Sequence, residues 1–318
     1  MKLLAGLFVI LMVCICGGCA NEYHALPSGS DSNSGIRFSV VRVASFNIWR
    51  DGKASKQPLS QTAEVIKASK ADIVGLQESS KNAKALADLL GWNYVRQNGS
   101  AVIMSRFEIP ETTENKYGVR IRLDSGQEIF VFNVHLRPFP YQPYQLLNIP
   151  YHGHSFIKTE KQAIAAAQKA RGHQVEALLK EIKAIKDKGM PIFITGDFNE
   201  PSHLDWTAAA ARSGRHPVKV VYPTSKALAK VGFVDTYRAI YPDEMKIPGY
   251  TWTPLTKVSD PKDHHDRIDF VYYRGKGVKA KSVQIVGENP DNGDIVVSPY
   301  PSDHRAVVST FNIPRDSK

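Results

Sequence analysis

The sequence predicts an α/β (α+β) fold in which two β-sheets are covered by helices. Segments rich in Val, Ile and Phe alternate along the chain with segments whose apolar residues recur at helical spacing. Such alternation is typical of layered domains that contain both sheets and helices. From Ile36 to about Pro314 the sequence has no second linker, no low-complexity tract and no internal repeat. We therefore expect one domain over residues 36–318.

The expected strands are short, apolar and bounded by polar or turn residues. They are Arg42–Trp49, Asp72–Gln77, Ala101–Ser105, Val119–Leu123, Ile129–Leu136, Ile192–Asp197, Ile268–Tyr273, Ser282–Val286 and Ala306–Phe311.

The longest expected helix runs from about Thr159 to Lys188. Thr159 is a suitable N-cap, and Gly189 stands where a helix is expected to stop. Apolar residues between Val175 and Ile185 fall on one face at helical spacing. Shorter helices are expected over Gln61–Ser69 and Asn82–Leu90.

The N-terminus has the pattern of a targeting segment. Lys2 precedes an apolar run that ends in Gly-Gly-Cys19, so we expect a signal peptide over residues 1–18 and a flexible tether over residues 19–35. The small residues before Cys19 resemble a bacterial lipobox, which implies cleavage before Cys19 and a lipid on its thiol. An ordinary secretory signal is the alternative. The expected location is a bacterial membrane, at the outer membrane or cell surface, or otherwise the periplasm or the medium.

Cysteine use and charge limit the classes of function. All three cysteines, Cys14, Cys16 and Cys19, lie in the N-terminal segment, so the mature domain has no disulfide, cysteine nucleophile or thiolate zinc site. The formal net charge is +10, which favours an anionic partner such as nucleic acid or lipid. The stronger interpretation of the charge is that many lysines lie in helical stretches that form solvated faces.

Two polar residues follow buried strands early in the chain. Asn47 in SFNIW and Glu78 in GLQES each follow an apolar run, and such positions open at strand ends, where ligands bind in layered α/β folds. An amide oxygen and a carboxylate suit a hard divalent cation. A helix cap or a surface residue is the alternative for Glu78.

A third strand end carries a carboxylate and an amide. The segment GDFN places Asp197 and Asn199 after the apolar run Ile192–Thr195, and residues two apart in an extended chain point the same way. Together they can orient a water molecule and donate to a phosphate oxygen, whereas an Asx-turn is the structural alternative. His135, which follows another apolar run, could donate to a phosphate oxygen as well.

Asp269 lies inside an apolar run, between Ile268 and Phe270. A carboxylate there is costly to bury unless it is paired. His304, in the segment SDHRAV, is the expected partner, and the pairing would fix the imidazole tautomer and raise its basicity. A salt bridge to Arg267 is the alternative.

The motifs SFNIW, LQES, NVHL, GDFN, RIDF and SDH, in this order and spacing, resemble the endonuclease/exonuclease/phosphatase superfamily over residues 40–313. The resemblance implies a deoxyribonuclease-I-like four-layer sandwich, with two packed β-sheets flanked by helices, as the catalytic domain of a bacterial lipoprotein. It also implies hydrolysis of a phosphate ester with the help of a metal.

The same resemblance implies a metal site at Asn47, Glu78 and Asp303. Mg²⁺ is the expected cation, with Mn²⁺ or Ca²⁺ as alternatives. Some nucleases of the superfamily carry a further Asp ligand two residues after the first Asn. Trp49 occupies that position here and Asp51 should not share its geometry, which argues against an apurinic-site nuclease.

For the reaction itself, the resemblance implies that Asp197 orients or deprotonates the attacking water. It implies that Asn199 contacts the reacting phosphate and that His135 binds a non-bridging oxygen. His304, oriented by Asp269, would act as acid/base or would stabilise the transition state.

Substrate choice is expected to lie in loops around these motifs. The long segment 138–158 is rich in Tyr, Phe and His and is either a specificity lid or a packed surface loop. His203 and Trp206 either line the pocket or pack a following helix, and Trp252 forms a further wall.

The leading interpretation is an exported, monomeric phosphodiesterase acting on nucleic acid, a lipid headgroup or a sugar phosphate. A nuclease for extracellular DNA or RNA, or a phosphomonoesterase, is the alternative within this class. A non-catalytic surface binding protein on the same fold is the rival from another class.

Overall fold

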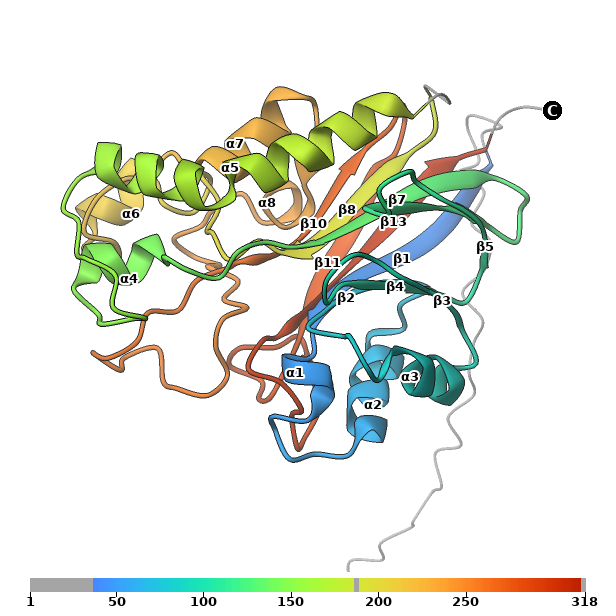
Figure 1. Ribbon diagram of the computed structural model, residues 1–318, viewed down its shortest axis with the longest axis horizontal. Coiled ribbons are helices and arrows are strands. Elements are labelled where there is room, and N and C mark those ends of the chain that lie inside the picture. Colours follow the sequence, from blue (N-terminus) through green and yellow to red (C-terminus); the bar gives the residue numbers. More distant parts are fainter. Residues whose placement is uncertain (1–36, 186–188, 316–318) are drawn as a thin grey trace, which may run out of the picture. The chain divides into compact units, whose positions relative to one another are not determined.

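The computed structural model describes residues 37–185 and 189–315. Two mixed β-sheets pack against each other, and helices cover the outer face of each sheet, so the predicted four-layer sandwich is confirmed (Figure 1). The predicted signal peptide and tether, and with them all three cysteines, lie outside the described residues. Within the described ranges, no helix combines the length and apolarity needed to cross a bilayer.

The seven-stranded sheet has the strand order β12-β11-β13-β1-β2-β4-β3. Its strands are β1 (Phe38–Asn47), β2 (Ile73–Gln77), β3 (Asn93–Arg96), β4 (Val102–Ser105), β11 (Lys279–Gly287), β12 (Ile295–Val296) and β13 (Ala306–Pro314). In its centre β1 runs parallel to β2, with Asn47 opposite Gln77, and antiparallel to β13. The carboxyl ends of β1 and β2 therefore open at the same edge.

The six-stranded sheet has the strand order β5-β6-β7-β8-β10-β9. Its strands are β5 (Glu108–Thr112), β6 (Gly118–Arg122), β7 (Glu128–His135), β8 (Ile192–Asp197), β9 (Val234–Asp235) and β10 (Asp269–Arg274). Here β7 runs parallel to β8, and β10 runs antiparallel to β8. The start of β10 consequently meets the ends of β7 and β8.

Helices form the two outer layers. They are α1 (Trp49–Gly52), α2 (Leu59–Ser69), α3 (Ala83–Leu90), α4 (Gln142–Leu147), α5 (Glu160–Ala184), α6 (Ala208–Arg212), α7 (Pro223–Lys230) and α8 (Thr236–Ile240). Apolar residues of α2 and α3 pack on the seven-stranded sheet, and those of α5 and α7 pack on the six-stranded sheet. In Figure 1, α5 lies along the outer face of β7, β8 and β10.

The space between the sheets is filled by apolar side chains such as Val43, Ile73 and Phe193. Toward the edge at which the carboxyl ends of β1 and β2 open, this filling becomes polar and includes Gln77, Asn133 and Thr195. A Cβ at Gly75 would lie 1.9 Å from Thr195 Oγ1, so the absence of a side chain at Gly75 lets the two sheets approach closely there.

The sequence predicted the main elements, but it placed some ends wrongly. Thr159 caps α5 with a capping box, as expected. The expected end at Lys188 is wrong, because the helix stops at Ala184 and Ile185 is extended, with ψ 125°, which lets its side chain pack against the core beneath α5. Strand β1 begins earlier than predicted because its first residues pair with the end of β13.

Candidate active site

Polar side chains from both sheets meet at one edge of the sandwich. Asn47 ends β1 and Glu78 directly follows β2 in one sheet, while His135 and Asp197 end β7 and β8 in the other. The strand register sets His135 opposite Asp197, and Asp197 opposite Asp269 on the antiparallel strand β10. The backbone pairing of the sheets therefore brings together residues that are far apart in the sequence.

Asp197 is the centre of the hydrogen-bond network and is almost fully buried, with 1% of its surface exposed. Its Oδ1 accepts a hydrogen bond from the backbone N–H of Asn199 at 2.9 Å. Its Oδ2 accepts from Asn47 Nδ2 at 3.0 Å and from Asn199 Nδ2 at 3.2 Å. The same Oδ2 lies 3.5 Å from His135 Nε2 and 3.7 Å from His304 Nε2. One carboxylate oxygen thus faces four polar side chains.

The predicted pair of Asp269 and His304 is present, and both side chains are buried. His304 Nδ1 lies 2.9 Å from Asp269 Oδ2. Burial lowers the pKa of the imidazole, but the negative charges of Asp269 and Asp197 outweigh it and raise the pKa of His304 to about 10. With Asp197, the pair places three possible metal donors within 4.8 Å of one another. These atoms already have partners, because His304 Nδ1 contacts Asp269 and Asp197 Oδ2 accepts from the amides of Asn47 and Asn199.

Glu78 and Asp303 form the acidic end of the site, and a divalent cation fits there. Asp303 Oδ1 is buried and has no hydrogen-bond partner among the described residues. Burial raises the pKa of Asp303 to about 6. The charge of Glu78 also raises this pKa, whereas the charge of His304 lowers it. A divalent cation would satisfy the orphaned oxygen and offset the repulsion between the carboxylates.

Asn47 connects the acidic end with Asp197. Its Nδ2 donates to Glu78 Oε1 at 3.3 Å and to Asp197 Oδ2 at 3.0 Å. Its Oδ1 accepts from the backbone N–H of Trp49 at 3.0 Å. An amide oxygen has two lone pairs, so this contact is compatible with the predicted role of Asn47 in metal binding.

The sequence reasoning did not find the function of Asp51. Its Oδ1 accepts hydrogen bonds from the backbone N–H groups of Ser80 at 2.5 Å and Lys81 at 2.7 Å, and its own N–H donates to the carbonyl of Glu78. Burial raises the pKa of Asp51, but these backbone hydrogen bonds outweigh it and lower that pKa overall. Asp51 therefore holds the turn that carries Glu78. No local sequence pattern predicts this contact, because Asp51 and its partners are about thirty residues apart in the chain.

Aromatic side chains form one wall of a cavity of about 260 Å³ over the catalytic residues. They come from the long segment after β7 and from the loop that contains Trp252, and they are Phe139, Tyr141, Tyr144, Tyr151, His152 and Trp252. The ring of Trp252 lies 4.8 Å from the ring of His304. Helix α4 inside the long segment is buried, so this segment is a packed loop that also lines the site.

His203 and Trp206, which follow GDFN in the sequence, lie away from the catalytic cavity. Trp206 is fully buried and stacks on His216 with 4.1 Å between ring centroids. His203 Nδ1 lies 2.8 Å from Ser225 Oγ, beside a separate cavity. Neither residue lines the catalytic cavity. The alternative prediction, that they pack within the fold, is therefore the correct one for both. Trp252 does line it, as predicted.

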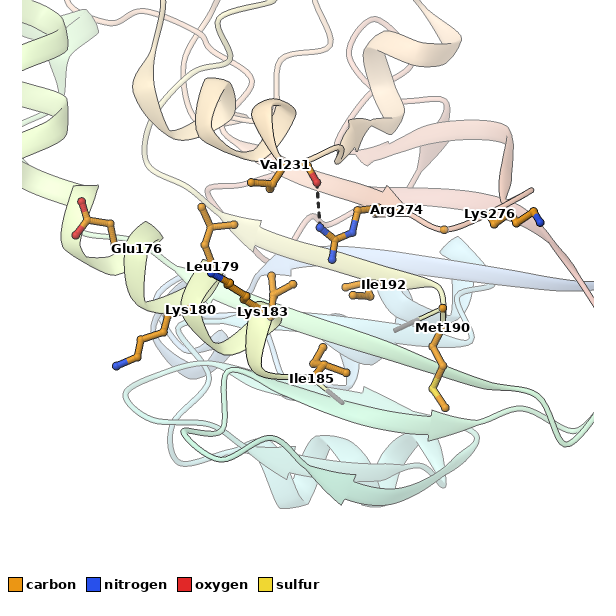
Figure 2. A pocket seen from close by; sticks show the side chains of 13 residues that line it. Glu176, Leu179, Lys180, Lys183, Ile185, Met190, Ile192, Val231, Arg274 and Lys276 are labelled. Atoms are coloured by element: carbon orange, nitrogen blue, oxygen red, sulfur yellow. Dashed lines mark hydrogen bonds between the residues drawn. The ribbon is translucent and has the colours of Figure 1, made fainter. Parts of the chain in front are cut away.

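A larger cavity, of about 800 Å³, lies beyond the opposite end of β8. Figure 2 shows apolar side chains such as Leu179 and Ile192 around it, with Arg274 donating to the carbonyl of Val231. Among the described residues that line it, Glu176 is the single carboxylate. Because strand β8 begins here and ends at Asp197, the catalytic residues belong to the smaller cavity.

Comparison with known proteins agrees with this geometry. The sequence model of the Endonuclease/Exonuclease/phosphatase family matches residues 44–304. The Caenorhabditis elegans protein F14F9.5 is 32% identical over 294 residues, which cover 85% of this chain and 91% of that protein. The chain therefore belongs to the endonuclease/exonuclease/phosphatase family.

Several solved structures share the fold. An endonuclease/exonuclease/phosphatase from Beutenbergia cavernae aligns with a TM-score of 0.53 at 16% identity, covering 86% of this chain and 72% of that one. TDP2 from D. rerio, complexed with a single-strand DNA product, aligns with a TM-score of 0.52 at 18% identity, covering 86% and 100%. An AP endonuclease from Archaeoglobus fulgidus aligns with a TM-score of 0.52 at 17% identity, covering 85% and 98%.

Family membership and fold together define the chemical class. Proteins of this family hydrolyse phosphate esters and generally use divalent metals. This chain is accordingly a phosphate-ester hydrolase, with acidic and histidine side chains gathered where the two sheets open.

Proposed function

We propose that this chain is an exported, metal-dependent phosphodiesterase that cleaves its substrate by direct attack of water. One observation carries the proposal. The buried carboxylate of Asp197 lies between the acidic end of the site and the Asp269–His304 pair, within 3.7 Å of the imidazole of His304. A water held there would face a base on one side and a cationic stabiliser on the other.

Asp197 is the proposed base. It loses solvent through burial, and Asn47 and Asn199 fix its orientation through hydrogen bonds. In the reaction, water attacks phosphorus, its proton passes to Asp197, and the bond from phosphorus to the leaving oxygen breaks. The leaving oxygen takes up a proton from solvent, and Asp197 afterwards returns its proton to solvent. The products are a phosphate monoester and an alcohol.

The two histidines are proposed to stabilise charge on the phosphate. His304 lies between Asp269 and Asp197, an environment that favours the imidazolium. Such a group stabilises negative charge better than it accepts a proton. His135 is partly exposed at 18% of its side chain and can turn its Nε2 toward a non-bridging oxygen.

Asn199 has a restricted position. Its Nδ2 donates to the carbonyl of Leu136 at 3.0 Å and to Asp197 Oδ2 at 3.2 Å. Both amide hydrogens are thus used within the protein, so Asn199 first of all positions Asp197. Contact with phosphate requires the exchange of one of these hydrogen bonds.

Mg²⁺ is the cation that we propose for the acidic end, where Glu78, Asp303 and Asn47 would hold it. When bound, it supplies positive charge for the phosphate and the leaving oxygen. Carboxylate and amide oxygens are hard donors, which favours Mg²⁺ or Mn²⁺ over softer metals.

The proposed substrate is a phosphodiester that carries a flat or sugar-like group beside the phosphate. The rings of Tyr144, Tyr151 and Trp252 lie next to the catalytic residues, and such rings stack on bases and sugars. The formal net charge of +10 favours a polyanion. The candidate substrate classes are nucleic acid, lipid headgroups and sugar phosphates. A nuclease or a phosphomonoesterase is the second candidate on the same site.

Export rests on the sequence pattern around Cys19. We propose a lipid-anchored monomer at a bacterial membrane. Labelling with a radioactive fatty acid should mark the wild-type chain and spare a Cys19→Ser variant. Label on both would remove the proposed anchor.

The activity is tested with bis-p-nitrophenyl phosphate in Mg²⁺ or Mn²⁺. Wild type should hydrolyse it, and EDTA should abolish the rate. Asp197→Ala should lose roughly 10²- to 10⁴-fold in kcat. His173→Ala is the matched control, because His173 is an exposed histidine on helix α5. Equal rates for wild type and Asp197→Ala would refute catalysis at this site and favour a binding protein.

Hydrolysis of p-nitrophenyl phosphate, a monoester, is measured in parallel. A higher kcat/KM for the monoester than for the diester would overturn the phosphodiesterase proposal in favour of the phosphomonoesterase. Single-stranded DNA, RNA, phospholipids and sugar phosphates then rank the natural substrate classes.

A further inference from the structure

A cluster of two histidines and a carboxylate lies outside the catalytic residues. His216 and Asp266 are buried, and His264 is partly exposed at 16% of its side chain. We propose that His216, His264 and Asp266 bind a divalent cation of the Zn²⁺ class. This site is separate from the acidic end of the active site and differs from it in donor chemistry.

The spacing of the donor atoms suits a metal. His216 Nδ1 and His264 Nε2 lie 3.1 Å apart, and His264 Nε2 lies 3.9 Å from Asp266 Oδ1. Two imidazole nitrogens that share one zinc ion at about 2.0–2.1 Å lie roughly 3.0–3.4 Å from each other. The imidazole pair therefore already has the required separation. The three donor atoms all lie within 4.8 Å of one another, so the carboxylate has to move closer to the two imidazoles to complete the set.

Neighbouring side chains fix the orientation of the donors. The indole of Trp206 stacks on His216 at 4.1 Å and 9° between ring planes, and its Nε1 donates to Asp266 Oδ1 at 2.9 Å. Tyr141 donates its hydroxyl to Asp266 Oδ2 at 2.7 Å. Hydrogen-bonded outer partners of this kind orient the ligands in metal sites.

The charge of Asp266 supplies an independent reason for a cation. Only 3% of the residue is exposed, and its hydrogen-bond donors, Trp206 and Tyr141, are neutral. In the described part of the chain no Lys or Arg forms an ion pair with it, and the adjacent Arg267 is engaged by Asp205 and Asp235. A buried carboxylate without a counter-charge is costly, and coordination of a metal is one way to offset that cost.

A proton on His264 is the alternative occupant. The Nε2–H of His264, in the neutral or the charged ring, could donate to His216 Nδ1 at 3.1 Å, but the 3.9 Å to Asp266 Oδ1 exceeds a hydrogen bond. A metal would contact all three donors, whereas the proton contacts two.

The cluster is linked to the wall of the active site. Tyr141 donates to Asp266 and lines the catalytic cavity. The backbone of Trp252 pairs with Asp266 on one side and with His304 on the other. A cation here would therefore stiffen the aromatic wall, while imidazole donors select a softer cation than the oxygen donors of the active site.

The stoichiometry of Zn²⁺ binding tests the proposal. Purified wild type and variants are dialysed against buffered Zn²⁺ at pH 7.5 in excess Mg²⁺, and bound zinc is measured by mass spectrometry. Wild type should retain one equivalent more than His264→Asn. His173→Asn, a change at an exposed histidine on α5, should match wild type. Equal zinc contents in wild type and His264→Asn would overturn the site and leave the proton as occupant.

A second readout separates loss of the site from loss of the fold. Co²⁺ bound by imidazole nitrogen gives visible ligand-field bands, which should appear in wild type and be absent from both His264→Asn and His216→Gln. Circular dichroism should show the same secondary structure in all of them. Zn²⁺ should raise the urea midpoint of wild type but not of a folded His264→Asn variant. A midpoint that Zn²⁺ leaves unchanged in wild type would also contradict the proposal.

Discussion

Replacing Asn133 with alanine should destabilise the fold and weaken catalysis together. Asn133 lies on β7 between the two sheets and is 1% exposed. Its Nδ2 lies within hydrogen-bond distance of the Leu76 carbonyl (2.9 Å), Gln97 Oε1 (3.0 Å) and the Val102 carbonyl (3.1 Å). The partners Leu76 and Val102 belong to strands of the opposite sheet, so a single side chain ties the sheets together.

The magnitude follows from the partners that the truncation leaves behind. Gln77 Nε2 also bonds to Asn133 Oδ1, but it keeps other acceptors in Ser45 and Gly75. The acceptors of Nδ2 lose their shared donor, and each buried unsatisfied group costs about 1–3 kcal/mol. A water can enter the space that the amide leaves, so we expect a loss of about 3–5 kcal/mol in the free energy of unfolding.

The assay is urea unfolding followed by fluorescence and circular dichroism, with kcat/KM measured on the folded fraction. Asn93→Ala is the control, because Asn93 is exposed and its side chain donates one hydrogen bond, to the carbonyl of Phe107. It should cost less than about 1 kcal/mol. A similar small cost for Asn133→Ala would refute the idea that this network holds the sheets in place.

Three further predictions concern buried or partly buried charges. Asp269→Asn keeps the shape of the partner of His304 but removes its charge, and kcat should fall roughly 10²- to 10⁴-fold with unchanged circular dichroism; a kcat near that of wild type would contradict the pairing. Asp51→Ala frees the turn before α3, so Mg²⁺ affinity measured by calorimetry should fall about 10- to 100-fold; unchanged affinity would exclude a positioning role. Burial raises the pKa of Glu288, but hydrogen bonds from Arg305 outweigh it and lower that pKa below its ordinary 4.5. The ion pair therefore stabilises the fold above about pH 4.5, and this contribution is lost as the pH falls through the lower folded-state pKa. Glu288→Gln should lower stability by about 1–3 kcal/mol at pH 7 and by much less at pH 3; a cost independent of pH would contradict the argument.

The sequence predicted those parts of the fold that local pattern controls. Apolar runs such as Ile192–Asp197 mark central strands because both faces of such strands are buried. The short edge strand β3 (Asn93–Arg96) escaped prediction, since it is exposed or half-exposed throughout. The same holds for β12, whose two residues form a strand only because β11 pairs with them. Where pairing rather than side-chain pattern defines a strand, the sequence carries little signal.

In the site, too, the sequence predicted the features that local pattern controls and missed those that depend on the tertiary structure. The motifs identified the residues at the strand ends, and the structure brings them together. Backbone conformation was not readable, because Glu78 and Asn199 adopt left-handed φ values of 56° and 48°, which residues other than glycine take rarely and at a cost of about 1–3 kcal/mol. Asp51 supports one of these turns from a distant segment. Such long-range support follows from the tertiary fold, which a single sequence does not display.

The aromatic wall of the catalytic cavity is held in place by buried hydrogen bonds. This rigidity affects how the substrate is selected. Arg171, fully buried on α5, donates to the carbonyls of Arg137 and Pro140 and to Gln142 Oε1. These contacts fix the start of the long loop, and the hydroxyl of Tyr141 is fixed by Asp266. The loop cannot swing freely as a lid, because its opening would leave the buried N–H groups of Arg171 without these acceptors. Substrates should therefore be selected by the fixed shape of the aromatic wall. For this reason Trp252→Ala should change the ratio of the KM values of different substrates more than it changes kcat for any one of them.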